Sequence, residues 1–207
     1  AKALATRGAL QSDPKKALAD LNEAIKLLPE NTEAIRARAE YYLENDQTEQ
    51  GLKDLEKALE LEPDHARTHE FRATALAILK RYEEARKSLD KAIELQPRSI
   101  TAYIQRGRVL LLLEKPEDAA ADFTKVIAAQ PIPQILLLRA AAYQMQKKNE
   151  KALEDVDAAL KLNPEMPEAL RARAMLLAGT GNITGAIGDL EQLKKIETKD
   201  ADVLLQL

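Results

Sequence analysis

Apolar residues recur along the whole chain at the spacing of one helix face. In segments 32–44 and 48–61 they fall at i, i+3, i+4 and i+7, the period of an amphipathic α-helix. Polar breaks separate such segments, and proline stands where a new helix is expected to begin, at Pro14, Pro116, Pro133 and Pro167. The pattern predicts about twelve antiparallel helices followed by a short C-terminal piece, with no strand.

A second set of prolines gives the chain a longer period. Pro29, Pro63, Pro97 and Pro131 are spaced by 34 residues, and Pro164 follows after 33. Two series of small residues keep the same phase: Ala5, Ala39, Ala73, Gly107, Ala140 and Ala174, and then Ala17, Gly51, Ala85, Ala119, Ala152 and Ala186. A period in this range predicts a solenoid built from copies of one helix pair. The missing residue is expected in the turn at 130–133, because the phase changes only there.

With each of these prolines set at position 32, the repeats resemble those of the tetratricopeptide repeat (TPR) family, a helix–turn–helix of 34 residues. Small residues stand at positions 8 and 20, and large apolar residues stand at position 24: Leu21, Leu55, Leu89, Phe123, Val156 and Leu190. The family's Trp at position 4 is replaced by Ile35, His69, Tyr103, Leu136 and Leu170. The resemblance implies an all-α fold, namely a right-handed α-solenoid of antiparallel helix pairs, the TPR superhelix.

The resemblance covers the whole chain, so residues 1–207 are expected to form a single TPR array. The predicted repeats are 1–31, 32–65, 66–99, 100–132, 133–166 and 167–200, with 201–207 as the start of a seventh repeat or a cap. Both ends look truncated, because Ala1 falls at position 4 and the last residue falls at position 7. We expect either a fragment of a longer array or an array with one truncated cap.

Position 7 carries an arginine in five of the repeats, where the family more often has Leu. An aspartate follows sixteen residues later in four of them, which gives the pairs Arg38–Asp54, Arg106–Asp122, Arg139–Asp155 and Arg173–Asp189. The two positions lie at similar heights on the two helices of one pair, where an arginine can bind a carboxylate with two hydrogen bonds. We interpret the pairs as structural ion pairs rather than as a ligand-binding row. Arg72 has Ser88 instead, so it must pair elsewhere or be more exposed.

Composition narrows the classes of partner. The net charge is −3, with 31 basic and 34 acidic residues, so the basic excess of a nucleic-acid binder is absent. The signs are mixed locally, and the longest aliphatic run, Val109 to Leu113, is far shorter than the roughly 20 residues that cross a membrane. We therefore expect no nucleic acid as a partner and no membrane insertion.

No motif for catalysis, a metal or a cofactor stands out. His65 and His69 are four residues apart, a spacing that can bind a metal, but position 4 is a packing site and His65 falls in a turn. The chain has no Cys, and its glycine cluster at 179–188 lacks the strand and the Lys of a phosphate loop. The sequence thus predicts no catalytic, metal-binding or cofactor-binding residue, and a protein that is not an enzyme.

The resemblance also implies a trough lined by the first helices, where family members bind peptides or extended segments. Its lining is most apolar in repeats four to six, and the candidate peptide-binding residues are Ile104, Gln105, Arg108, Leu112, Leu138, Gln144, Met145, Arg171 and Met175. The carboxylate clamp of the co-chaperone TPRs is not matched, since Thr6 and Ala37 stand where that subfamily has Asn. Alternatively, Leu111, Leu112 and Leu137 simply pack between adjacent first helices.

These observations favour a non-enzymatic scaffold that binds an extended segment of a protein partner. Two alternatives remain open. The chain could be a homo-oligomerising assembly module, in which the apolar stretch or an uncapped terminal repeat packs on another copy. It could also be the regulatory arm of an enzyme whose catalytic domain lies outside these residues.

Overall fold

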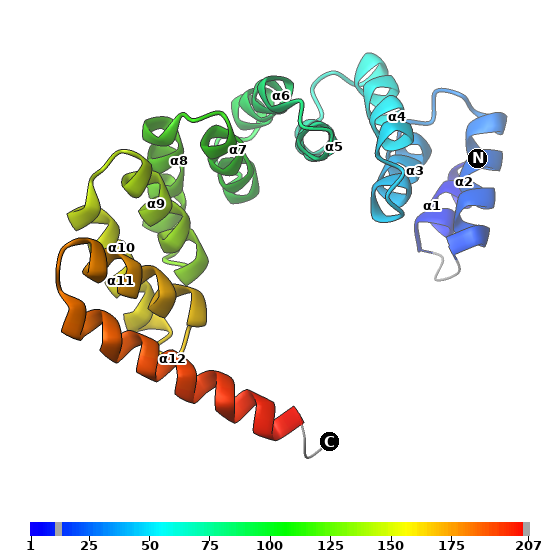
Figure 1. Cartoon of the computed structure of the whole chain (residues 1–207). Helices are drawn as coiled ribbons and strands as arrows, with labels where there is room; N and C mark the ends of the chain where they lie inside the picture. Colours follow the sequence, from blue (N-terminus) through cyan, green and yellow to red (C-terminus); the bar gives the residue numbers. More distant parts are fainter. Residues whose placement is uncertain (11–13, 205–207) are drawn as a thin grey trace. The chain divides into compact units, whose positions relative to one another are not determined.

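The computed structural model describes residues 1–10 and 14–204, and every regular element in that part of the chain is an α-helix (Figure 1). The helices are α1 (Lys2–Leu10), α2 (Pro14–Leu27), α3 (Thr32–Glu44), α4 (Thr48–Leu61), α5 (Ala66–Ile78), α6 (Tyr82–Leu95), α7 (Ile100–Leu112), α8 (Pro116–Ala129), α9 (Pro133–Met145), α10 (Asn149–Leu162), α11 (Pro167–Gly179) and α12 (Ile183–Leu204). Consecutive helices form antiparallel pairs, with an odd-numbered first helix and an even-numbered second helix. The predicted all-α fold of helix pairs is confirmed.

The chain divides into two compact units, residues 1–109 and 110–207, and the division falls within α7. Unit one contains α1 to α6 and most of α7. Unit two contains the end of α7 and the helices α8 to α12. The single array and its six repeat boundaries stay a prediction.

Small residues allow the two helices of a pair to approach closely. In the pair of α3 and α4, Ala39 is fully buried, and a Cβ added to Gly51 would lie 3.0 Å from Cδ2 of Leu43 and 3.1 Å from the carbonyl oxygen of Ala39. A Cβ on Gly8 would likewise lie 2.7 Å from Cγ of Leu21. A larger side chain at these positions would force the helices apart, because a packed interior has no spare volume.

Successive pairs bury apolar residues against each other. In unit one, Leu21 and Ala24 of α2 form a buried cluster with Ala34 of the following first helix, α3. In unit two, Val156 of α10 lies in a buried cluster with Ala169 and Leu176 of α11. One pair cannot cover its own apolar face, so each pair depends on its neighbour.

The turns inside the pairs share one backbone motif. Asp46, Lys80, Glu114, Lys147 and Gly181 adopt φ values of 55° to 84° at the middle of three-residue turns. After α9, the amide of Lys147 donates to the carbonyl of Gln144, and the amide of Lys148 donates to that of Tyr143, both at 2.8 Å. These two bonds define a Schellman motif, which satisfies carbonyls left free at a helix end.

The turns between pairs confirm the position of the missing residue. Four residues separate the pairs at 28–31, 62–65, 96–99 and 163–166, but only three, residues 130–132, separate α8 from α9. The second helices α4, α6, α8 and α10 all keep 14 residues, and the first helices α3, α5, α7, α9 and α11 keep 13. The deletion therefore shortens a turn and leaves the helices intact.

The C-terminal helix differs from the other second helices. α12 has 22 residues and continues to Leu204, because Thr198 stands where proline ends the earlier second helices. The described part of segment 201–207 continues α12 instead of forming a separate piece. Its assignment to a seventh repeat or a cap stays a prediction.

We predict that Lys147→Gly raises the free energy of unfolding by about 1 kcal/mol, since a side chain with Cβ is strained at φ 60° and Gly is not. Gly181→Ala is the matched control. A Cβ there meets no atom within 4 Å, so only the backbone at φ 84° opposes it, and a loss of similar size is expected. Urea unfolding measures both. A destabilised Lys147→Gly variant would show that the Lys147 side chain contributes more than its backbone costs.

Candidate functional site

Three of the position-7 arginines bind the aspartate sixteen residues later through two hydrogen bonds. Arg38 donates from Nε and Nη2 to the two carboxylate oxygens of Asp54 at 2.7 and 2.8 Å. The distances are 2.8 and 2.7 Å for Arg139 with Asp155, and 2.8 and 2.6 Å for Arg173 with Asp189. The structure thus brings together three of the four predicted pairs. Arg106 and Asp122 belong to different units, and their pairing stays a prediction.

Each of these arginines also reaches back to the preceding second helix, a contact that the sequence reasoning missed. Arg38 donates to Asn22, Arg106 to Asp90 and Arg173 to Asp157, each sixteen residues earlier, at 2.8 to 2.9 Å. Arg139 donates to Thr124, fifteen residues earlier, because the intervening turn is one residue shorter. The sequence does carry a signal for this contact, because position 25 holds a residue with a hydrogen-bond acceptor in each of the first five repeats. An arginine on a first helix therefore contacts the second helices of two consecutive pairs.

The two repeats that depart from the Arg–Asp pattern keep equivalent contacts. Arg72 donates to the hydroxyl of Ser88 at 2.6 Å and to Glu56 at 3.2 Å. Of the two predicted outcomes, pairing with another residue or greater exposure, the structure thus shows pairing, with Glu56. In the first repeat, position 7 is Leu4, and Asp20 instead accepts two bonds of 2.6 Å from Arg7. These hydrogen bonds lower the pKa of the Asp20 carboxyl.

The position-7 arginines also contact aromatic rings, and their ion pairs favour the charged form of the guanidinium. The guanidinium of Arg38 lies 5.9 Å from the ring centre of Tyr42, and that of Arg139 lies 5.7 Å from the ring centre of Tyr143. Hydrogen bonds with Asp189 raise the pKa of Arg173 above its ordinary value. The arginines are therefore held charged and half-buried, with their donors occupied, which supports a structural role.

Both histidines contact the protein itself. His65 is the N-cap of α5, and its Nδ1 accepts from the backbone amide of Thr68 at 3.2 Å. Nε2 of His69 lies 2.8 Å from the carbonyl oxygen of Pro63. Burial lowers the pKa of His65, so at neutral pH the ring is uncharged and Nδ1 is available as an acceptor.

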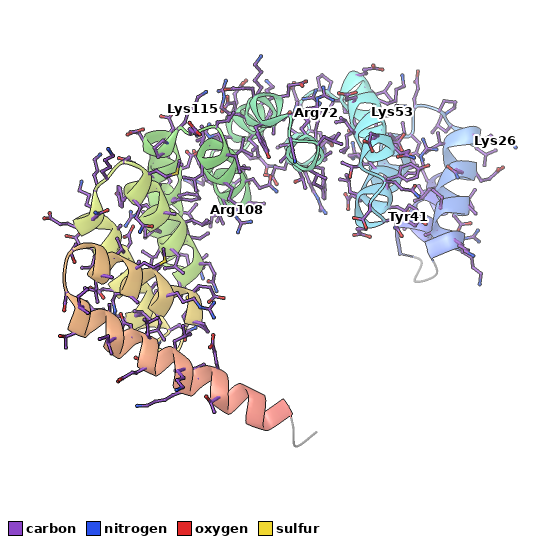
Figure 2. The ribbon with its side chains drawn as sticks, in the orientation of Figure 1. Lys26, Tyr41, Lys53, Arg72, Arg108 and Lys115 are labelled. Carbon is purple, nitrogen blue, oxygen red and sulfur yellow. The ribbon has the colours of Figure 1, made fainter. Side chains whose placement is uncertain are left out.

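The candidate residues Ile104, Gln105 and Arg108 belong to unit one. Ile104 is partly buried, and Arg108 is exposed on α7 (Figure 2). Gln105 is partly buried, and its amide donates to the hydroxyl of Thr74 on α5 at 3.3 Å. Gln105 is thus already engaged between two first helices, while Arg108 faces solvent.

In unit two, the candidate residues divide by exposure. Met175 is 72% exposed, Leu112 is 56% exposed and Met145 is 47% exposed. Gln144 is exposed too, whereas Leu138 is partly buried. Leu111 is also partly buried, and Leu137 packs against the buried cluster of α9 to α12. The packing interpretation therefore describes Leu137, while Met145 and Met175 remain open to solvent.

Arg171 has a partner that the sequence reasoning missed. Its guanidinium forms an ion pair with Glu197, and both side chains are more than half exposed. Arg36 and Glu62 stand at the same two repeat positions in unit one and form the equivalent ion pair at 2.6 Å, although α4 ends at Leu61, so the contact does not depend on the longer α12. The pair of Arg171 and Glu197 places a solvent-exposed charge one helical turn from Met175 on the same face of α11.

Comparison with known proteins places the chain in a family. Sequence profiles described as tetratricopeptide repeat match residues 36–100 and 104–157, and a second profile of the same description matches residues 138–205. The chain belongs to the tetratricopeptide repeat family. TPR domains are typically protein–protein interaction modules and are typically non-catalytic. No curated protein sequence matches the chain significantly.

Solved structures share the TPR fold of the chain. MamA 41-end from Desulfovibrio magneticus RS-1 is 22% identical, with a TM-score of 0.78 over 81% of this chain and 96% of that chain. PilF of Pseudomonas aeruginosa is 22% identical, with a TM-score of 0.76 over 94% and 90%. YrrB is 19% identical, with a TM-score of 0.74 over 86% and 92%. In the described part of this TPR chain, no helix is long and apolar enough to cross a membrane.

We predict that Arg139→Met lowers the free energy of unfolding by about 2–4 kcal/mol, because Asp155 would stay buried without a counter-charge. Arg72→Met is the matched control and should cost about 1 kcal/mol, since it leaves only the Ser88 hydroxyl and a half-exposed Glu56. Urea unfolding measures both variants. Equal losses would mean that the arginines stabilise through their aliphatic stems.

We predict that the cap at His65 makes stability depend on pH. Its folded-state pKa lies below the ordinary value of about 6.5, so the unfolded chain binds more protons between the two values. The free energy of unfolding therefore falls as the pH drops through and below about 6.5. His65→Asn keeps a capping acceptor and should reduce this loss between pH 7.5 and 5.5. His69→Gln is the control, in which the contribution of His65 should persist; an unchanged loss in His65→Asn would contradict the assignment.

Proposed function

We propose that the chain is a non-enzymatic scaffold that binds an extended segment of a partner protein along its first helices. The observation that carries this proposal is the exposure of large apolar side chains at fixed repeat positions. Position 13 is exposed in repeats two to six, and it is apolar in three successive repeats, at Ile78, Leu112 and Met145. Stacking of the repeats never buries this position, so its apolar residues remain available to a partner.

Met145 and Met175 suit contact with an extended segment. Methionine is unbranched and polarisable, so it adapts to side chains of different shape. Positions 9 and 13 lie one turn apart on the same face of a first helix, which places Met175 and Met145 on the corresponding face of α11 and α9. The partner segment would therefore present apolar side chains at this face, with Leu112 and Leu138 contributing to the same set.

Polar groups on the same helices can orient the segment. Gln144 is exposed, and an amide can both donate to and accept from a backbone in extended conformation. Arg171 is paired with Glu197, but an ion pair this exposed contributes little stability and can exchange for a partner's carboxylate. In unit one, Ile104, Gln105 and Arg108 of α7 stay candidate binding residues, and Arg108 is the exposed cation among them.

Two considerations support the proposal. TPR domains typically mediate protein–protein interaction, and the solved structure of YrrB is described as that of a TPR protein with an unusual peptide-binding site. Binding by a second copy of this chain at the same face is the alternative of self-assembly. The regulatory arm of an enzyme would use the same face, with a catalytic domain outside these residues.

The test uses peptides selected on the 207-residue chain from a random linear display library. We expect their affinity to fall about tenfold or more in a Met145→Asp, Met175→Asp double variant, because two apolar contacts become charged. Isothermal titration calorimetry measures the dissociation constants. The control double variant, Leu27→Asp with Leu162→Asp, changes two similarly exposed apolar residues at position 30 of second helices and should bind normally.

Selected peptides that bind the folded methionine double variant with unchanged affinity would exclude this face as the site. Size-exclusion chromatography with light scattering separates the alternative. A dimer that the methionine substitutions convert to a monomer would favour self-assembly over binding of a partner segment.

A further inference from the structure

The outer face of α12 carries an apolar stripe that no described helix of unit two covers. Ile183, Ile187 and Leu190 are spaced by four and three residues, and each is at least 50% exposed. The neighbouring face of the helix packs on unit two through Ala186, Asp189 and Leu193, all of them buried. Figure 1 shows α11 on the inner side of α12 and no other helix of unit two beyond it.

The earlier repeats show what covers this face. Leu190 stands at position 24, and the five earlier residues at that position are at most 1% exposed: Leu21, Leu55, Leu89, Phe123 and Val156. Part of that cover is the next first helix. Leu21 clusters with Ala34 of α3 as well as with Ala5 of its own pair, and Val156 clusters with Ala169 of α11 as well as with Ala140 of its own pair. The stripe on α12 therefore has the chemistry of a surface that receives a first helix.

A charged group beside the stripe specifies the incoming helix further. Glu191 stands at position 25, where Asn22, Asp90, Thr124 and Asp157 each accept a hydrogen bond from the arginine of the following first helix. Glu191 is exposed and has no hydrogen bond or ion pair within the described part of the chain. The acceptor that closes the junction between earlier pairs is present on α12, and no arginine in the described part of the chain binds it.

We propose that the outer face of α12 is a docking site for an arginine-bearing amphipathic helix from a partner protein, which occupies the place of a following first helix. The first helices of this chain define its chemistry, with a buried residue followed four positions later by arginine, as in Ala34 and Arg38 or Ala169 and Arg173. The small side chain would lie on Leu190, and the guanidinium would reach Glu191. This site is separate from the methionine face of α9 and α11 and does not depend on it.

A second copy of this chain fits the site less well. Its first helix α1 carries Leu4 at the position where the other first helices carry arginine. Docking of α1 from a second copy would set Leu4 against Glu191 and leave the carboxylate unpaired. A partner helix with arginine satisfies both the apolar stripe and the charge.

The probe is a fluorescein-labelled peptide with the sequence of residues 31–46, which carries the capping Asn31, Ala34 and Arg38. Fluorescence anisotropy should show saturable binding to the 207-residue chain, and Leu190→Asp should weaken it about tenfold or more. Glu191→Gln should weaken the native peptide severalfold and leave a peptide with Arg38→Gln unchanged. In the charge reversal, Glu191→Arg should bind a peptide with Arg38→Glu better than it binds the native peptide.

Leu190 and Glu191 are exposed, so their substitution should leave the fold intact, which circular dichroism checks. Leu162→Asp on α10 is the matched control and should bind the peptide normally. Three results would overturn the proposal. They are the absence of saturable binding, binding that Leu190→Asp leaves unchanged, and binding that the methionine double variant abolishes instead. A dimer of the chain that Leu190→Asp converts to a monomer would assign the face to a second copy and overturn it as well.

Discussion

The distance between the two helices of a pair constrains every other contact in this protein. Alanine or glycine at positions 8 and 20 sets that distance, and a Cβ at Gly51 would already require its neighbours to shift by a few tenths of an ångström. Helices this close leave little width between them for side chains at the flanking positions. A flat, extended group that carries its own hydrogen-bond donors can fill such a gap, and the guanidinium of arginine has that shape.

The position-7 arginine connects consecutive repeats through hydrogen bonds. Its guanidinium binds an acceptor on each of two second helices, as that of Arg173 does with Asp189 and Asp157. Four of the aspartates at position 23 are buried, namely Asp54, Asp122, Asp155 and Asp189, so they require a counter-charge at that place. A charge inside a packed segment is therefore compatible with packing, because the neighbouring helices supply every partner it needs.

The sequence alone predicts the features that recur in every repeat. It does not predict the contacts that depend on which residues lie nearby in the fold. The 34-residue period was enough to place the helices and the shortened turn, since both follow from register. The left-handed residues Asp46, Lys80 and Lys147 escaped notice, because none of them is the glycine that usually marks such a turn. The second acceptor of each arginine lies in the preceding repeat, which a search within single repeats does not reach. Leu137 and Leu138 could not be separated, because adjacent residues of a helix differ in burial only through their neighbours.

Comparison of equivalent positions distinguishes two kinds of exposed apolar surface. Position 13 is exposed throughout repeats two to six, so its side chains vary freely, from Glu44 through Leu112 to Gly179. A surface of that kind can contact ligands of many sequences, because no fixed partner constrains it. Position 24 is buried in every repeat but the last, so the exposed Leu190 differs from all five equivalent residues. The groups around Leu190 retain the register of a helix–helix junction, and that register restricts what can bind there far more narrowly than the first-helix face does.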